Sequence, residues 1–349
     1  MRENKVHSPI RFVTAAVRRA VARKRRGNVI LMYHRVTHTD IDPWGLCVDP
    51  SNFAEQMEVL GSLAKPVSLE QLPLMHTDHP VVAVTFDDGY VDSMESALPA
   101  LEQHAIPATL FVSTGYIGSP NGYWWDQLQE IFLSPRALPS DDLILSLGRK
   151  TYRWVIGRAD LAYDAEDCTA HRGWIAWRDA PPTSRHAVFH HVWRVLRELD
   201  AKERDETVGR ICRWAGVSEG RASARCMTAD ELREVSRGPL VRIGSHTVTH
   251  SRLSRLTDAS EWTELTGSKA TLENILKRPV EMFSYPFGDR SDYSNRTVAA
   301  LRKAGYRLAC SNFEGAVGPK SDTFQLPRLH VQNWNGSDFE KWLFSHLAS

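Results

Sequence analysis

Short runs of β-forming residues alternate with helical patterns along this chain from residue 28 onward. Several of these runs are apolar throughout, as VVAVTF is at 81–86, and this composition is typical of parallel strands that are buried on both faces. Repeated strand–helix units predict an α/β domain, for which a parallel barrel is one of the two usual closures. The expected strands lie at 28–36, 81–86, 108–114, 240–246, 281–287, 306–312 and 326–331.

Residues 119–225 interrupt this alternation. They contain no convincing strand and hold seven of the eleven tryptophans, and RHAVFHHVWRVLREL at 185–199 has the pattern of an amphipathic helix. We therefore expect a basic leader at 1–27, an α/β domain formed by 28–118 and 226–349, and a mostly helical, Trp-rich insertion at 119–225. Most of the tryptophans are expected in the core, although the pair in GYWWDQ could stack on a sugar ring.

The composition fits a globular protein better than one whose surface is built for nucleic acid, because the 349 residues carry a net charge of only +1. The five cysteines are scattered and form no C-x-x-C pair. We expect them to be buried, reduced thiols of a cytoplasmic protein rather than disulfides or zinc ligands. No stretch reaches the ~18 uninterrupted apolar residues of a membrane-spanning helix.

The leader has a chemistry of its own, because residues 1–26 hold nine Lys or Arg residues and one Glu. Arg18 and Arg19 interrupt its apolar run, so a secretory signal is not expected. Phe12 and several Val and Ala residues recur at helical spacing opposite the arginines, which would suit a helix lying on the inner face of an anionic membrane. One alternative is that the basic leader has no partner. Another is that it binds nucleic acid, but we do not expect nucleic acid to be a partner of this protein.

Two polar clusters follow apolar strands. Asp87 and Asp88 come directly after the strand at 81–86, and His246 and His250 stand four residues apart after the strand at 240–246. Each cluster alone is usually a solvated turn or a surface feature, but active sites of α/β barrels are built at the carboxyl ends of strands. Two imidazoles and one carboxylate form the open three-ligand arrangement of a catalytic metal.

A divalent cation at this place would offset the charge of the two adjacent carboxylates. One aspartate would bind the metal, and the other would stay free to take a proton from an attacking water. Zinc is the expected ion, and cobalt, nickel or iron would suit the same donors.

These residues resemble the motifs of a known family. TFDDGY at 85–90 and SHTVTHSRLS at 245–254 are similar to the first two motifs of the NodB-like polysaccharide deacetylases, carbohydrate esterase family four. YPFGDRSDYS at 285–294 resembles the third motif, and LPRLHV at 326–331 resembles the fifth. The resemblance implies a deformed (β/α) barrel that removes N-acetyl, or related N-acyl, groups from amino sugars.

The resemblance also implies roles for individual residues. Asp87 becomes the general base, and Asp88, His246 and His250 become the metal ligands, while Thr247 braces the loop between the histidines.

On the substrate side, the backbone N–H of Tyr90 would help to hold the oxyanion. Tyr285, Pro286 and Phe287 would form a wall of the substrate groove.

Two departures from the family pattern concern the base and its surroundings. Members commonly carry an arginine two residues before the proline of the third motif, where this chain has Ser284, so Arg290 or Arg328 is expected to substitute. We also assign Arg328 to substrate binding. The fourth motif has no clear counterpart near CSNFEG at 310–315.

The catalytic acid has two candidates. LMYHRV at 31–36 resembles the opening strand of a subfamily that processes exopolysaccharides, in which this histidine, here His34, supplies the acid from a permuted place in the barrel. His330 occupies the position of the ordinary fifth motif. We prefer His34, while for both histidines a purely structural role stays open.

The sequence thus predicts a metal-dependent N-deacetylase that acts on an N-acetylated glycan, either a polysaccharide or an intermediate of glycan biosynthesis. One alternative is an amidase of the same superfamily that acts on a small non-sugar amide. Another is a carbohydrate-binding relic without metal.

Overall fold

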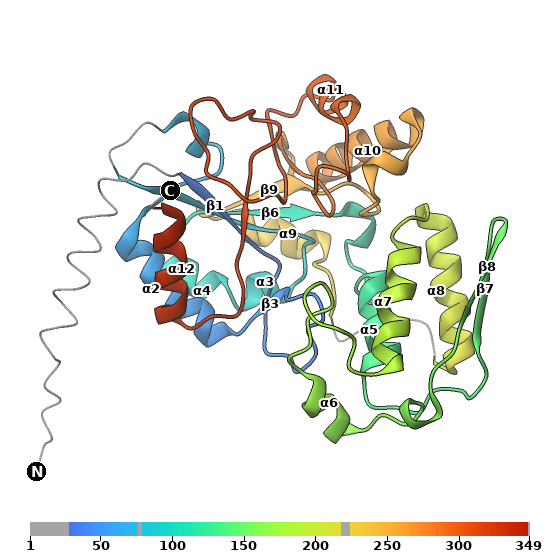
Figure 1. The fold of residues 1–349 in the computed structure, drawn as a ribbon. Helices are drawn as coiled ribbons and strands as arrows, with labels where there is room; N and C mark the ends of the chain where they lie inside the picture. The colour runs from blue at the N-terminus through green and yellow to red at the C-terminus, as the bar shows by residue number, and fades with distance from the viewer. Residues whose placement is uncertain (1–27, 76–78, 218–223, 348–349) are drawn as a thin grey trace, which may run out of the picture.

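The computed structural model describes residues 28–75, 79–217 and 224–347, so the leader at 1–27 lies outside the described residues. In these ranges the chain builds one large parallel sheet, flanked by helices (Figure 1). The strands of this sheet are β1 (Val29–Tyr33), β4 (Lys65–Pro66), β5 (Val81–Phe86), β6 (Ala108–Val112), β9 (Val241–Ser245), β10 (Met282–Ser284), β11 (Leu308–Cys310) and β12 (Leu329–His330).

The strand order in this sheet is β11, β10, β9, β6, β5, β1 and β12, with β4 paired to the start of β5. All of these pairs are parallel. Each of the strands expected from the sequence is present, and β5 is buried at all of its positions, as its apolar composition predicted. A separate short parallel pair joins β2 (Arg35–Val36) and β3 (Cys47–Val48).

The segment 323–330 connects the two edges of the sheet. At its beginning, the Ala309 N–H donates to the Thr323 carbonyl, and Cys310 forms a parallel bridge with Leu326 next to β11. At its end, β12 pairs with β1. The curled parallel sheet confirms the deformed (β/α) barrel.

Alternate residues of each strand face opposite sides, which gives the sheet two apolar layers. The inner layer packs residues of different strands against one another, including Ile30, Ala83, Phe111, Met282 and Leu326. The outer layer packs other strand residues against helices, as β1 does against the apolar face of α2 (Pro50–Leu63). The buried face of α2 includes apolar residues that recur at helical spacing, namely Phe53, Met57, Leu60 and Leu63.

The remaining helices of the barrel cover its outside, and α12 packs against α2 (Figure 1). They are α3 (Asp92–Glu95), α4 (Leu98–Gln103), α9 (Ala229–Val235), α10 (Asp258–Leu276), α11 (Asn295–Lys303) and α12 (Gly336–Leu347). Single 3-10 turns lie at η1 (Leu72–Leu74), η2 (Thr114–Tyr116), η3 (Arg158–Asp160) and η4 (Leu253–Arg255). Thr228 and Glu231 form a capping box at the start of α9.

The region 119–225 is mostly helical in its described part, and α5 packs against both α7 and α8. Its helices are α5 (Trp124–Leu133), α6 (Ala165–His171), α7 (Ser184–Leu196) and α8 (Ala201–Ala215). Trp124, Phe132, Phe189 and Val192 belong to an apolar cluster distinct from the two layers of the sheet. The division of the chain into separate domains stays a prediction.

The expectation that this region contains no strand was wrong. It holds an antiparallel hairpin of β7 (Leu143–Leu147) and β8 (Lys150–Trp154). In β7 three buried leucines alternate with exposed residues, which is the period of a half-buried strand. The turn between the strands contains Gly148 at a φ of 55°. The run is too short, and too rich in charge on its second strand, for this alternation to stand out in the sequence.

Two further findings concern the cysteines and the apolar character of the helices. No disulfide is formed, and all five cysteine side chains are buried, as the sequence predicted. Within the described ranges, no helix combines the length and the apolar character needed to cross a bilayer.

Candidate active site and metal centre

The candidate site lies at the carboxyl ends of the parallel strands. Asp87 and Asp88 follow β5, His246 follows β9, His34 follows β1, and His330 ends β12. Because the strands are parallel, their carboxyl ends meet at the same edge of the sheet, and the structure brings together residues that are up to about 300 positions apart in the chain.

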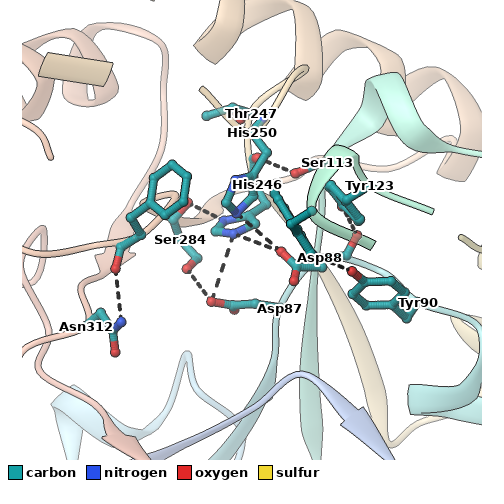
Figure 2. Close-up of polar contacts among 12 residues, drawn as sticks. Asp87, Asp88, Tyr90, Ser113, Tyr123, His246, Thr247, His250, Ser284 and Asn312 are labelled. Carbon is teal, nitrogen blue, oxygen red and sulfur yellow. Dashed lines mark hydrogen bonds and ion pairs between the residues drawn. The ribbon is translucent and has the colours of Figure 1, made fainter. Parts of the chain in front are cut away.

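Asp88, His246 and His250 form a compact group of potential metal ligands (Figure 2). The Asp88 Oδ1 atom lies 3.5 Å from His246 Nε2 and 3.3 Å from His250 Nε2. All three residues are buried, and their donor atoms lie within 4.8 Å of one another. Asp88 Oδ1 is also buried without a hydrogen-bond donor. A set of two imidazole donors and one carboxylate donor at these distances fits a divalent cation such as zinc.

The two histidines are in the form that metal binding requires. The Nδ1 atom of His246 lies 2.7 Å from the Ser284 carbonyl, so the ring donates there and turns the Nε2 lone pair toward Asp88. Burial lowers the pKa of His246 to about 4 and that of His250 to about 3, which leaves both rings neutral at neutral pH. Burial raises the pKa of Asp88, and a bound cation would favour its ionised form again.

The backbone that carries the ligands is strained. Asp88, Thr247, His250 and Phe287 have φ values of 75°, 68°, 52° and 62°, in the left-handed region that residues with a Cβ rarely adopt. Surrounding hydrogen bonds must hold such a conformation in place. The His250 N–H donates to Thr247 Oγ1 over 3.0 Å, which is the brace expected from the sequence.

Glu264 of α10 holds the same loop from the outside, and the sequence analysis missed it. Its carboxylate accepts hydrogen bonds from the N–H groups of Val248 and Thr249, both at 2.8 Å, and from the Thr249 hydroxyl at 2.7 Å. Neither its position in a helix nor its neighbours in the sequence indicate this contact.

Asp87 is held by Arg328 rather than by Arg290. The guanidinium of Arg328 donates to both carboxylate oxygens of Asp87, each over 2.7 Å, and the Ser284 hydroxyl donates to the same carboxylate over 3.2 Å. Burial by itself would raise the pKa of Asp87, but the ion pair with Arg328 outweighs it and holds that pKa well below its usual range. Arg290 instead lies over the ring of Phe313.

This geometry changes the role expected of Arg328. The side chain is 1% exposed and reaches the cavity from behind Asp87, with further hydrogen bonds to Thr85 and to the Ser311 carbonyl. Its guanidinium therefore positions the carboxylate of Asp87, while the assignment of Arg328 to substrate binding stays a prediction.

His34 and His330 both line the cavity, and their ring centroids lie 5.5 Å apart in an edge-on arrangement. Each ring has one buried nitrogen without a hydrogen-bond partner, Nδ1 in His34 and Nε2 in His330. Burial lowers the pKa of each to about 4. In both rings Arg328 adds to this shift and Asp87 opposes it, and in His34 the charge of Asp88 opposes it as well.

The cavity has a volume of about 550 Å³ and is lined by Asp87, Asp88 and both ligand histidines together with aromatic side chains. Tyr285 and Phe287 are among its lining residues, whereas Pro286 is not. The aromatic residues that the region 119–225 contributes to the lining are Trp125, Trp177 and Trp193. Trp125 is 5% exposed, so it is a core residue that nevertheless reaches the site.

Tyr90 points away from the cavity. Its side chain is fully buried, donates from its hydroxyl to Asp126 over 2.8 Å, and accepts from Trp125 Nε1 over 2.8 Å. Only the backbone N–H of Tyr90 is left for the oxyanion role expected from the sequence. Asn312, in the stretch where no fourth motif was recognised, donates from its side chain to the Phe287 carbonyl over 2.9 Å.

Comparisons with known proteins agree with this geometry. The model of a family described as polysaccharide deacetylase matches residues 75–137 and 179–309, just over half of the chain. A candidate polysaccharide deacetylase of Bacillus subtilis (strain 168), YxkH, is 28% identical over 120 residues, which are 34% of this chain and 42% of that protein. The chain thus matches less than half the length of this relative.

Solved structures share the fold over nearly the whole chain. The Streptococcus pyogenes deacetylase PplD, solved with acetate, has a TM-score of 0.55 and 17% identity, covering 93% of this chain and 99% of its own. IcaB from Ammonifex degensii has a TM-score of 0.54 and 16% identity, covering 93% of this chain and 97% of its own. At these identities the likeness concerns the fold.

Proposed function

The chain belongs to the polysaccharide deacetylase family, and from this premise we propose that it is a metal-dependent N-deacetylase. Its substrate would be an amino sugar that carries an N-acetyl group, in a polysaccharide or in an intermediate of glycan biosynthesis. The observation that carries the proposal is the donor group of Asp88, His246 and His250 beside Asp87, whose ionised form Arg328 maintains.

The proposed metal site uses the three donors directly. Asp88, His246 and His250 would hold a divalent cation, with zinc as the first choice and cobalt, nickel or iron as alternatives. When bound, the cation supplies Lewis-acid polarisation of the amide carbonyl.

The other residues move protons and position groups. Asp87 accepts a proton from the attacking water, since its carboxylate is ionised and aligned by Arg328. The water oxygen adds to the acyl carbon, the C–N bond breaks, and the departing nitrogen takes up a proton from a histidine. The backbone N–H of Tyr90 is the proposed donor to the developing oxyanion. The products are acetate and a free amino sugar.

We propose His34 as this proton donor, with His330 as the alternative. Both rings are at the cavity, and burial lowers the pKa of each to about 4, so their titration does not rank them. The preference for His34 rests on its place directly after β1, where the sequence resembles the opening strand of a deacetylase subfamily that carries its acid there.

The test distinguishes the role of Asp87 from the role of Asp88. The metal-loaded protein is incubated with a panel of N-acetylated glycans and lipid- or nucleotide-linked sugars, and acetate release and bound metal are measured. Asp87→Asn should keep about one metal ion per chain but lose roughly 10²–10⁴ in kcat, because an amide cannot take the proton. The Asp88→Asn, His246→Ala double variant should lose the metal, because two of three ligands are gone.

Three results would contradict the proposal. Metal loss in Asp87→Asn would mean that the roles of the two aspartates are reversed. Full metal occupancy in the double variant would remove the ligand assignment. Acetate release from small non-sugar amides but from no glycan would favour the amidase alternative.

A further inference from the structure

Helix α7 separates the catalytic cavity from a second cavity. His190, Trp193, Arg194 and Arg197 line the catalytic cavity, at the spacing of one helix face. The second cavity has a volume of about 600 Å³, and the next face of the same helix lines it with His191, Arg194 and Val195, while Glu198 lines it from just beyond the end of the helix. Trp193, Arg194 and Arg197 belong to both linings, so the two cavities meet along the ridge of α7.

The opposite wall of the second cavity is aromatic. Tyr152 and Trp154 of β8 line it, and their rings stack with centroids 5.4 Å apart and an interplanar angle of 7°. Trp154 is buried, while Tyr152 is only partly buried. Both residues belong to the stretch 138–178, which lies between the two segments that match the family model. This aromatic wall is therefore not part of the region that the family model covers.

The second cavity is positively charged. Arg194, Arg197 and Arg255 line it together with one acidic residue, Glu198. Glu198 is already paired with Arg255 and with Arg252, at 2.5 Å each. The lining therefore keeps a net positive charge. The catalytic cavity differs, because acidic side chains outside the proposed metal site also line it.

Arg194 is the arginine that is free to bind a ligand. Arg197 is held by Asp292 over 2.6 Å, and Arg255 is held by Glu198. Arg194 is exposed on the ridge between the cavities, and no carboxylate in the described part of the chain pairs with it. Its planar guanidinium could bind a carboxylate or a phosphate oxygen pair in a bidentate way.

We propose that the second cavity is an accessory subsite that binds an anionic group of the same glycan that is deacetylated in the first. This inference rests on the proposed function. A sugar ring packs against the partly buried ring of Tyr152, and the carboxylate or phosphate of that sugar pairs with Arg194. The substrate is then an acidic, N-acetylated glycan that is long enough to cross the ridge of α7.

The test measures binding of matched charged and neutral probes to the full chain by titration calorimetry. The probes are an oligosaccharide of alternating glucuronate and N-acetylglucosamine, the same oligosaccharide with its carboxyls reduced to alcohols, and an N-acetylglucosamine oligosaccharide with and without a phosphate. We expect a preference for at least one charged probe over its neutral partner. Arg194→Gln should weaken binding of that charged probe roughly tenfold and leave its neutral partner unchanged.

Two further variants control this result. Arg194→Lys should retain part of the preference, because it keeps the charge but not the bidentate geometry. Arg237→Gln should leave it intact, because the exposed Arg237 follows α9 near the amino end of β9, at the opposite edge of the sheet from the site. The pair of probes whose charged member binds more tightly, and does so only with Arg194 present, shows whether the bound anion is a carboxylate or a phosphate.

Equal binding of charged and neutral probes in both pairs would overturn the proposal, and so would an Arg194→Gln variant that weakens both members of a pair alike. Acetate release is measured in parallel. Charge-selective binding without acetate release would contradict the proposed function and support the subsite. Acetate release without charge selectivity would contradict the subsite and support the function.

Discussion

Asp87 and Asp88 are neighbours in the chain, but the fold gives them opposite surroundings. Both side chains are 3% exposed. Asp87 has a bidentate ion pair with Arg328, whereas one oxygen of Asp88 lacks any hydrogen-bond donor and faces two neutral imidazoles. A buried carboxylate without a donor is unfavourable, and it becomes favourable when a cation fills the space beside it. The two residues are thus suited to different roles, Asp87 as the general base and Asp88 as a metal ligand.

Replacing Arg328 by Met should destabilise the protein through Asp87. In the wild type the folded pKa of Asp87 lies below its unfolded value of about 4. Ionised Asp87 therefore stabilises the fold above that pH, and this contribution is lost as the pH falls through the folded pKa. Without Arg328, burial raises the pKa instead. We expect a loss of about 3–5 kcal/mol in the free energy of unfolding at pH 7, and a smaller loss toward pH 4.

Urea unfolding of the metal-free protein at several pH values measures this effect. The Asp87→Asn, Arg328→Met double variant is the control, because it removes the buried charge together with its partner. It should recover most of the lost stability. A double variant as unstable as Arg328→Met would show that the loss comes from packing and not from charge.

Single-residue variants also test whether His34 or His330 is the proton donor. His34→Ala should lower kcat on an amide substrate by roughly 10²–10⁴, and His330→Ala should lower it much less. The loss in His34→Ala should be milder on an ester analogue, because an alcohol leaving group needs protonation less than an amine does. Steady-state kinetics on paired amide and ester substrates measures both effects. A severe defect in His330→Ala with an active His34→Ala variant would assign the acid to His330.

At the scale of elements, the loop after β9 depends on a helix that supplies none of the proposed metal ligands. Thr247 and His250 are held at positive φ, which a loop of ordinary residues would not adopt on its own. Glu264 of α10 binds two N–H groups of this loop and one hydroxyl, so packing of α10 against the sheet fixes the position of both histidines. Rigid support of this kind is what metal ligands require.

Glu264→Gln should therefore weaken metal binding without removing a ligand. An amide keeps one acceptor oxygen but cannot accept all three hydrogen bonds as a carboxylate does, and we expect a roughly 10–100-fold loss of metal affinity. Competition with a chelator measures it. Glu273→Gln is the matched control, because Glu273 lies on the same helix and accepts from the Val280 N–H, away from the histidine loop. Equal losses in both variants would mean that the effect is a general weakening of α10.

At the scale of the whole molecule, the segment 323–330 completes the site. It joins the two edges of the sheet and, in doing so, places Arg328 beside Asp87 and His330 beside His34. The region 119–225 supplies the opposite side of the cavity, with aromatic residues of α5 and α7. Neither part alone forms the site, so the substrate space is a property of the assembled fold.

The leader is assigned only from the sequence, and we propose that it holds a cytoplasmic protein at the inner face of the membrane. Deleting residues 1–26 should weaken binding to phosphatidylserine-containing vesicles by roughly 100-fold or more, because each basic residue near such a surface contributes about 1 kcal/mol. Turnover on a soluble substrate should stay nearly unchanged. Vesicle sedimentation with neutral phosphatidylcholine vesicles as the control measures this. If the full-length protein does not bind anionic vesicles, the proposal that the leader binds the membrane is contradicted.

The sequence by itself determined seven strands of the large sheet and the positions of the proposed metal ligands. The apolar runs are local signals, and residues placed directly after parallel strands must meet at one edge of a sheet, so the places of Asp87, Asp88, His246 and His250 in the chain are enough to group them. The capping box at Thr228 is local in the same way, because its hydrogen bonds join residues three positions apart.

Only the tertiary structure decided which arginine holds Asp87, that Glu264 fixes the histidine loop, and that Tyr90 turns its side chain away from the cavity. The Asp87–Arg328 contact spans 241 positions, and no local pattern encodes a pairing between residues so far apart. The hairpin of β7 and β8 was missed because its short strands gain their stability from packing against helices of the same region. Such contacts exist only after the chain has folded, since each depends on where several elements come together.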